Sequence, residues 1–113
     1  MKPIDLIKQT LETYLKHGWE LRRVLLRRET IALLHAEPGC DSLPLSATQV
    51  REASIDALWF SRASHEQREA WELRHLAENP FALFETFEAD ETEEQREELR
   101  CEMEARMRER LEK

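Results

Sequence analysis

The chain has 113 residues, of which 41% are hydrophobic and 36% are charged, and its formal net charge is −7. This length suits one domain, residues 1–113, with an ordinary core, and the apolar content excludes disorder along the whole chain. Residues 85–113 hold 12 acidic and six basic side chains, so the acidity belongs to the C-terminal segment. We expect neither nucleic acids nor membranes as partners, because both attract basic surfaces.

The N-terminal segment has the signals of a helix. Ile4, Ile7, Leu11 and Tyr14 recur at helical spacing after Pro3, and Gly18 supplies a left-handed stop. We therefore predict a helix over about residues 3–17.

The segment from Trp19 to Arg28 is rich in residues that favour strands, but its apolar and charged residues alternate poorly. A strand is predicted, and a second helix is the alternative. Residues 30–36 suit a short helix that ends before Pro38 and Gly39, although the sequence does not decide between helix, strand and loop over residues 30–54.

Three strands are predicted in the middle of the chain. Residues 55–62 carry apolar side chains on both sides, as in an internal strand, and this strand could begin as early as Val50. The runs Ala70–Leu76 and Phe81–Phe87 flank a turn signal at residues 78–80 and predict a hairpin.

The two hairpin strands differ in their patterns. In the first, Trp71 and Leu73 share a core face, and Glu72 and Arg74 point to the other face, which predicts a wet side. In the second, Leu83 and Phe84 point to opposite faces, so each face of that strand needs a cover.

The C-terminal segment predicts an acidic amphipathic helix over about residues 90–112. Asp90 and Thr92 begin two overlapping capping boxes, and no Gly or Pro follows. Its apolar residues repeat every four positions and form one narrow stripe: Leu99, Met103, Met107 and Leu111. This stripe has two candidate uses, which are packing on the protein's own sheet and contact with a partner or a second copy.

Together these elements predict an α+β fold. We expect an N-terminal helix, a mainly antiparallel sheet of about four strands in meander order, and the C-terminal helix. The rival is a mostly helical domain in which residues 19–36 form one continuous helix.

Arginines lie on several of the predicted strands. A guanidinium-rich face formed by Arg23, Arg27, Arg62 and Arg74 would suit an anionic ligand. The alternative is neutralisation by acidic residues on the same strands and on the C-terminal helix.

No motif requires a particular catalytic chemistry. The segment His65 to Glu69 lacks the second histidine of the HExxH zinc motif, and two glycines in the whole chain cannot build a phosphate loop. His35, Cys40 and Asp41 could form a thiolate site only if they met in space. We assign no catalytic, metal or cofactor-binding residue and expect no cofactor.

The location is predicted from the start of the chain and from the cysteines. Residues 1–5 lack the pattern of a secretion signal, and no window approaches about 18 continuous apolar residues. Cys40 and Cys101 lie far apart and form no CxxC pair, which favours reduced thiols and a cytoplasmic protein.

The leading functional hypothesis is a non-enzymatic protein-interaction or self-assembly module, in line with the apolar stripe and the absence of catalytic spacing. The alternatives are a small-molecule binder that uses the arginine face and an enzyme that uses Cys40 or a histidine.

Overall fold

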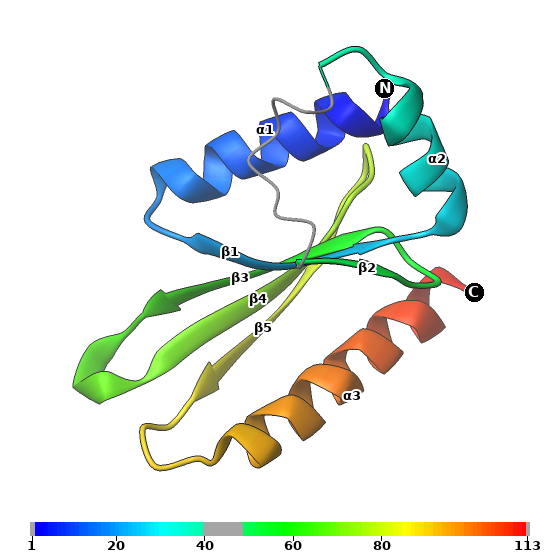
Figure 1. Ribbon diagram of the computed structural model, residues 1–113. Coiled ribbons are helices and arrows are strands. Elements are labelled where there is room, and N and C mark those ends of the chain that lie inside the picture. The colour runs from blue at the N-terminus through cyan, green and yellow to red at the C-terminus, as the bar shows by residue number, and fades with distance from the viewer. Residues whose placement is uncertain (1, 40–48, 113) are drawn as a thin grey trace.

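A computed structural model describes residues 2–39 and 49–112 (Figure 1). The chain forms, in order, α1 (Pro3–Lys16), β1 (Glu20–Leu26), α2 (Arg28–Ala36), β2 (Val50–Glu52), β3 (Ala57–Ala63), a 3-10 turn (His65–Gln67), β4 (Glu69–His75), β5 (Ala82–Phe87) and α3 (Glu93–Leu111). This architecture confirms the predicted α+β class with a helix at each end. The rival helical domain is wrong, because residues 20–26 form a strand.

Within the described part of the chain, the sheet has five strands in the order β2-β1-β3-β4-β5. The pairs β1–β3, β3–β4 and β4–β5 are antiparallel, which confirms the predicted meander. The additional strand β2 runs parallel to β1 and places Val50 opposite Val24, so the sheet is mixed. Residues 50–52 therefore form a strand of their own instead of extending β3.

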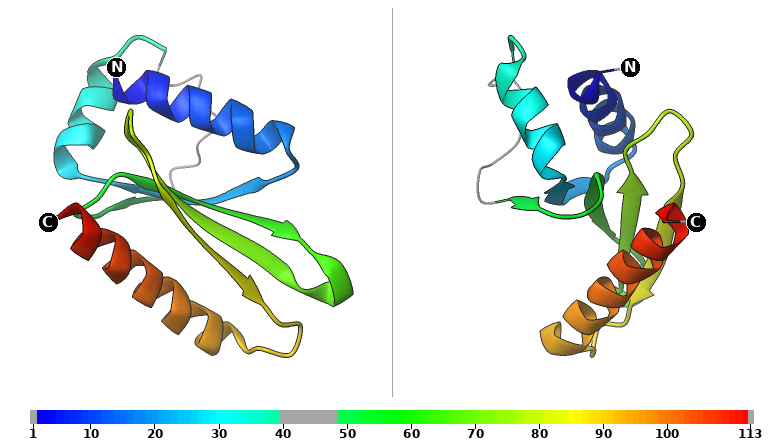
Figure 2. Two further views of the ribbon diagram at one scale, coloured as in Figure 1. Left: turned by 180° about the vertical axis from the view of Figure 1, so that it is seen from behind. Right: turned by 90° about the vertical axis from the view of Figure 1, so that its right-hand side faces the viewer.

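Helices cover both faces of the sheet. Figures 1 and 2 show α1 and α2 on one side and α3 on the other. The α1 face buries Ile4, Ile7, Leu11, Tyr14, Val24, Leu26, Leu34, Leu58, Phe60 and Leu76. The α3 face buries Leu25, Ile55, Ala57, Trp59, Trp71, Leu73, Phe87, Met103 and Met107.

The face that carries Glu72 and Arg74 is not a wet side, because α1 lies over it. The Tyr14 hydroxyl donates a hydrogen bond to the Glu72 carboxylate, and the Arg74 guanidinium lies 5.8 Å from the centre of the Tyr14 ring. The alternating pattern suggested exposure because both residues are charged, but each finds a partner under the helix and is half-buried.

A bulge in β1 explains its poor alternation. Leu21 pairs with Phe60 and Arg23 pairs with Trp59, so the register shifts between them and Arg22 is the extra residue. Leu21 therefore points to the α1 face and Arg23 to the α3 face, although two residues apart would normally share a face.

The turn from α1 into β1 is closed by a Schellman motif. The Trp19 amide donates to the Tyr14 carbonyl at 3.0 Å, the Gly18 amide donates to the Leu15 carbonyl at 3.1 Å, and Gly18 has a φ of 85°. This motif turns the chain back, and the rings of Trp19 and Tyr14 then meet edge-on at 5.9 Å.

Helix α3 begins with one of the two predicted capping boxes. The Thr92 hydroxyl accepts from the Gln95 amide, and the Gln95 side chain accepts from the Thr92 amide. None of the helices within residues 2–39 and 49–112 is long and apolar enough to cross a membrane.

Candidate interaction surface

The two edges of the sheet differ in how well they are protected. The outer edge strand β2 has three residues, of which Arg51 and Glu52 are charged and exposed. A short charged edge of this kind discourages pairing with another chain. The opposite edge strand, β5, has six residues and contains no proline and no basic side chain.

The outer edge of β5 has no strand partner among the described residues. The His75 amide donates to the Phe81 carbonyl at 3.0 Å, and the register then directs the backbone groups of residues 83 and 85 toward β4. The backbone groups of Ala82, Phe84 and Thr86 therefore point outward. This arrangement is the template that an added strand would need.

Both faces of β5 also carry apolar side chains that remain accessible. Phe84 points to the α1 face, where 57% of it is exposed. Leu83 and Phe81 point to the α3 face and are half-buried. The sequence predicts that both faces of this strand are covered. Phe87 is fully covered, but Phe84 is not. The edge strand therefore carries apolar side chains on both faces, as an interior strand does.

Phe84 belongs to an aromatic cluster that extends to the core. Tyr14 stacks on Phe60 with ring centres 4.1 Å apart, and Trp19 meets Phe84 edge-on at 6.4 Å. The Arg62 guanidinium lies 5.1 Å from the centre of the Trp19 ring and donates to the His17 carbonyl at 3.2 Å. Because Tyr14 and Phe60 are buried, the cluster holds Trp19 and Phe84 in place at the surface.

One outward amide of β5 is occupied by a side chain. The Thr86 amide donates to the Glu85 carboxylate at 3.2 Å. Glu85 lies on the α3 face, and its hydrogen bond satisfies a group that would otherwise be free at the edge. The amides of Ala82 and Phe84 have no such bond among the described residues.

The apolar stripe of α3 is used mainly inside the protein. Met103 and Met107 are 1% and 0% exposed and pack on the sheet, so the first of the two predicted uses applies to them. Leu99 is half-buried at the border of the same cluster, and Leu111 is 38% exposed near the end of the helix. A partner could therefore contact Leu99 and Leu111, but it could not reach the two methionines without displacing α3.

Two of the four candidate anion-binding arginines are paired with carboxylates. Arg23 donates two hydrogen bonds to Glu97, at 2.9 and 2.5 Å. Arg27 donates to Asp56 through its backbone amide at 2.8 Å and through its side chain at 3.1 Å. Both guanidinium groups therefore contact carboxylates of the chain itself.

The other two arginines lie apart from each other. Arg62 stands beside Trp19, whereas Arg74 lies at the other end of the hairpin, because it pairs with Leu58 and Arg62 pairs with Ala70. Arg74 lines an open groove of about 510 Å³ between α1 and the β4–β5 turn. A single guanidinium-rich face is therefore not formed.

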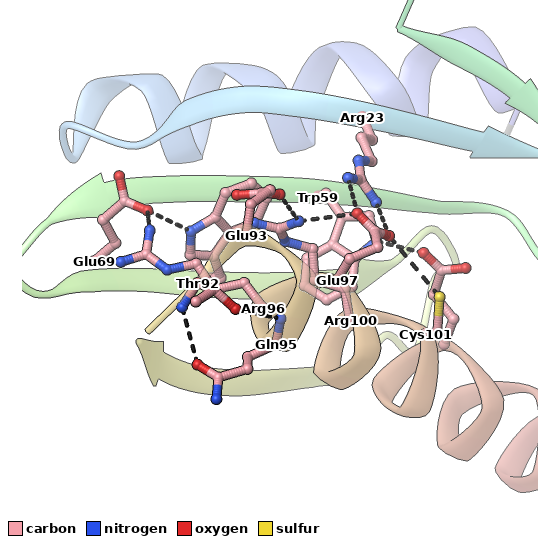
Figure 3. A network of polar contacts seen from close by, with 12 residues as sticks. Arg23, Trp59, Glu69, Thr92, Glu93, Gln95, Arg96, Glu97, Arg100 and Cys101 are labelled. Atoms are coloured by element: carbon pink, nitrogen blue, oxygen red, sulfur yellow. Dashed lines mark hydrogen bonds and ion pairs between the residues drawn. The ribbon is translucent and has the colours of Figure 1, made fainter. Parts of the chain in front are cut away.

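A buried arginine that sequence reasoning missed anchors α3 (Figure 3). Arg100 is 2% exposed, and its guanidinium lies 4.1 Å from the centre of the Trp71 ring. It donates to Glu93 at 2.7 Å and to Glu97 at 3.0 Å. The sequence signal for its burial is its spacing. Arg100 precedes Met103 and Met107 by three and seven residues, so the three residues share one face of the helix.

The hydrogen bonds from Arg23, with the nearby charge of Arg100, lower the pKa of Glu97 to about 2. A carboxyl group whose pKa is lower in the folded state stabilises the fold above its unfolded pKa, and this stabilisation is lost as the pH falls through the folded value. We expect Glu97→Gln to lose less stability than the wild type between about pH 4.5 and about pH 2. Urea denaturation at several pH values measures this.

The matched control is Glu98→Gln, at the exposed neighbouring position on α3. This variant should follow the wild-type curve. Identical pH dependence in Glu97→Gln and the wild type would show that the Arg23–Glu97 pair does not control acid stability.

The candidate catalytic residues are scattered. His35 and His65 are exposed, and Cys40 and Asp41 lie outside the described residues. His17 is the C-cap residue of α1, with its ring 2.7 Å from the Thr13 carbonyl, and His75 lies on β4. Within residues 2–39 and 49–112, no three His, Cys, Asp or Glu side chains are grouped so that they could hold a metal ion.

Comparisons with protein-family models, with curated proteins and with solved structures find no match for this chain.

Proposed function

We propose that the chain is a non-enzymatic, cytoplasmic self-assembly module that associates through β5. The observation that carries this proposal is the composition of the edge strand, with apolar side chains on both faces and outward backbone groups at Ala82, Phe84 and Thr86. An edge strand of this kind gains hydrogen bonds and buries apolar area when another strand pairs with it.

The proposed contact surface is on β5, and not on the apolar stripe of α3 that the sequence suggested. The two central methionines of that stripe stabilise the chain's own core, so β5 supplies the accessible apolar surface instead. Phe84 contributes most of it, and Trp19 extends it toward α1. A seam of one six-residue strand is short, so we expect a dissociation constant on the order of 10–100 µM.

Phe84→Lys should abolish self-association, because it removes the exposed ring and brings ammonium groups of neighbouring copies together. Light scattering after size-exclusion chromatography, over a range of concentrations, measures the mass. The wild type should approach a dimer with increasing concentration, whereas the variant should remain a monomer.

Leu33→Lys is the matched control. Leu33 is 54% exposed, close to the value for Phe84, but it lies on α2 and not on β5. Its substitution should leave the mass unchanged, and both variants should keep the unfolding midpoint that the wild type shows well below its dissociation constant, where it is monomeric. A monomeric wild type at all concentrations, or a Phe84→Lys variant that still dimerises, would contradict the proposal.

A further inference from the structure

We propose that two copies of the chain pair their β5 strands antiparallel, with Phe84 of each copy on the two-fold axis. This inference rests on the proposed self-assembly and specifies its partner, register and symmetry. It extends the five-stranded sheet into one sheet of two copies, with both α3 helices on the same face.

The hydrogen-bonding pattern permits this register. Residues 82, 84 and 86 direct their backbone groups outward, so Phe84 can exchange two hydrogen bonds with Phe84 of the second copy. Ala82 then pairs with Thr86 on either side of the axis. All three outward-facing residues of each strand gain partners, which makes the strand complementary to itself.

Charge repulsion excludes one neighbouring register and the loss of a strand partner excludes the other. A pairing centred on Glu85 would place two carboxylates opposite each other, which is destabilising in a sheet. A pairing centred on Leu83 would leave Thr86 without a strand partner. Centring on Phe84 places each Glu85 opposite Leu83 of the second copy and joins the two exposed phenylalanine rings on the α1 face.

Arg110 of the second copy would lie near each Glu85 across the seam. The diagonal neighbours of Glu85 across the seam are Phe81 and Glu85 of the second copy, and the two Glu85 Cα atoms lie about 8 Å apart instead of directly opposite each other. The Arg110 guanidinium lies 4.2 Å from the centre of the Phe81 ring. Pairing would also require the Thr86 amide to donate to Ala82 of the second copy. Glu85 would therefore exchange its present bond with that amide for the Arg110 guanidinium of the second copy.

Disulfide formation between single-cysteine variants tests the register. In a background with Ser at positions 40 and 101, Leu83→Cys and Glu85→Cys are prepared separately, so that Phe84 is retained. Across the proposed seam, position 83 faces position 85 at a Cα separation of about 4.5 Å, which suits a disulfide. Two copies of the same variant would hold their cysteines about 8 Å apart, which is too far.

Mild oxidation of the two variants together should give the mixed disulfide dimer, whereas either variant alone should remain mostly uncrosslinked. Efficient cross-linking of one variant with itself would place the axis at that residue and overturn the proposed register. A dimer by mass that gives no cross-link in any combination would overturn the proposed register, and self-association would still stand. A monomer in both experiments would overturn the inference together with the proposed function.

Discussion

Arg100→Ala is expected to destabilise the protein by about 3 kcal/mol, measured as the free energy of unfolding in urea. The side chain of Arg100 is 2% exposed and fills the space between α3 and the rings of Trp71 and Phe87. Its truncation leaves a cavity there and removes the donor shared by Glu93 and Glu97. The helix should loosen first at its N-terminal half.

Arg100→Met separates packing from charge at the same position. Methionine keeps most of the apolar volume, and replacing a buried ionic group by a well-packed apolar one is often nearly neutral. We expect a loss of about 1 kcal/mol or less. Equal losses in the Met and Ala variants would show that the hydrogen bonds to the carboxylates, and not the packing, hold the helix.

Met107→Glu is expected to destabilise the protein by about 4 kcal/mol, because it places a carboxylate at a position that is 0% exposed and surrounded by apolar side chains. This loss is a large part of the stability of an ordinary domain, so part of the population should be unfolded without denaturant. Circular dichroism with urea titration measures it.

Leu111→Glu provides the comparison, since Leu111 belongs to the same stripe but is 38% exposed. Its free energy of unfolding should stay within about 0.5 kcal/mol of the wild type. If Met107→Glu were as stable as Leu111→Glu, the packing of α3 on the sheet would be wrong, and the stripe would again be available to a partner.

The elements with strong local signals were predictable from the sequence. Pro3 and Gly18 bracket α1, and the Thr92 capping box begins α3. The hairpin strands follow their apolar patterns, with boundaries that differ by one residue at most. In these segments local preference and tertiary packing favour the same structure.

Other features depend on contacts that a local pattern does not contain. The bulge at Arg22 changes the face of Leu21, so the alternation in β1 could not be interpreted without its partner strand. Strand β2 has three residues, and its pairing with β1 is non-local. The burial of Arg100 does not follow from its residue type, because burial of a guanidinium depends on the rings and carboxylates that surround it.

The candidate surface was predictable in part. The pattern of β5 showed apolar side chains on both faces, but only the strand order showed that β5 lies at an edge of the sheet. Whether the stripe of α3 contacts a partner depends on whether α3 covers the sheet. The spacing of its methionines does not decide this.

The bulge in β1 also affects the electrostatic field of the molecule. It turns two consecutive arginines toward the α3 face, where Arg23 binds Glu97 and Arg22 donates to Ser61 at 2.7 Å and lies 6.0 Å from the centre of the Trp71 ring. These cations, remote in sequence, stand beside the acidic first half of α3. An approaching ion therefore meets a weaker negative potential there than the excess of acidic residues in the C-terminal segment implies.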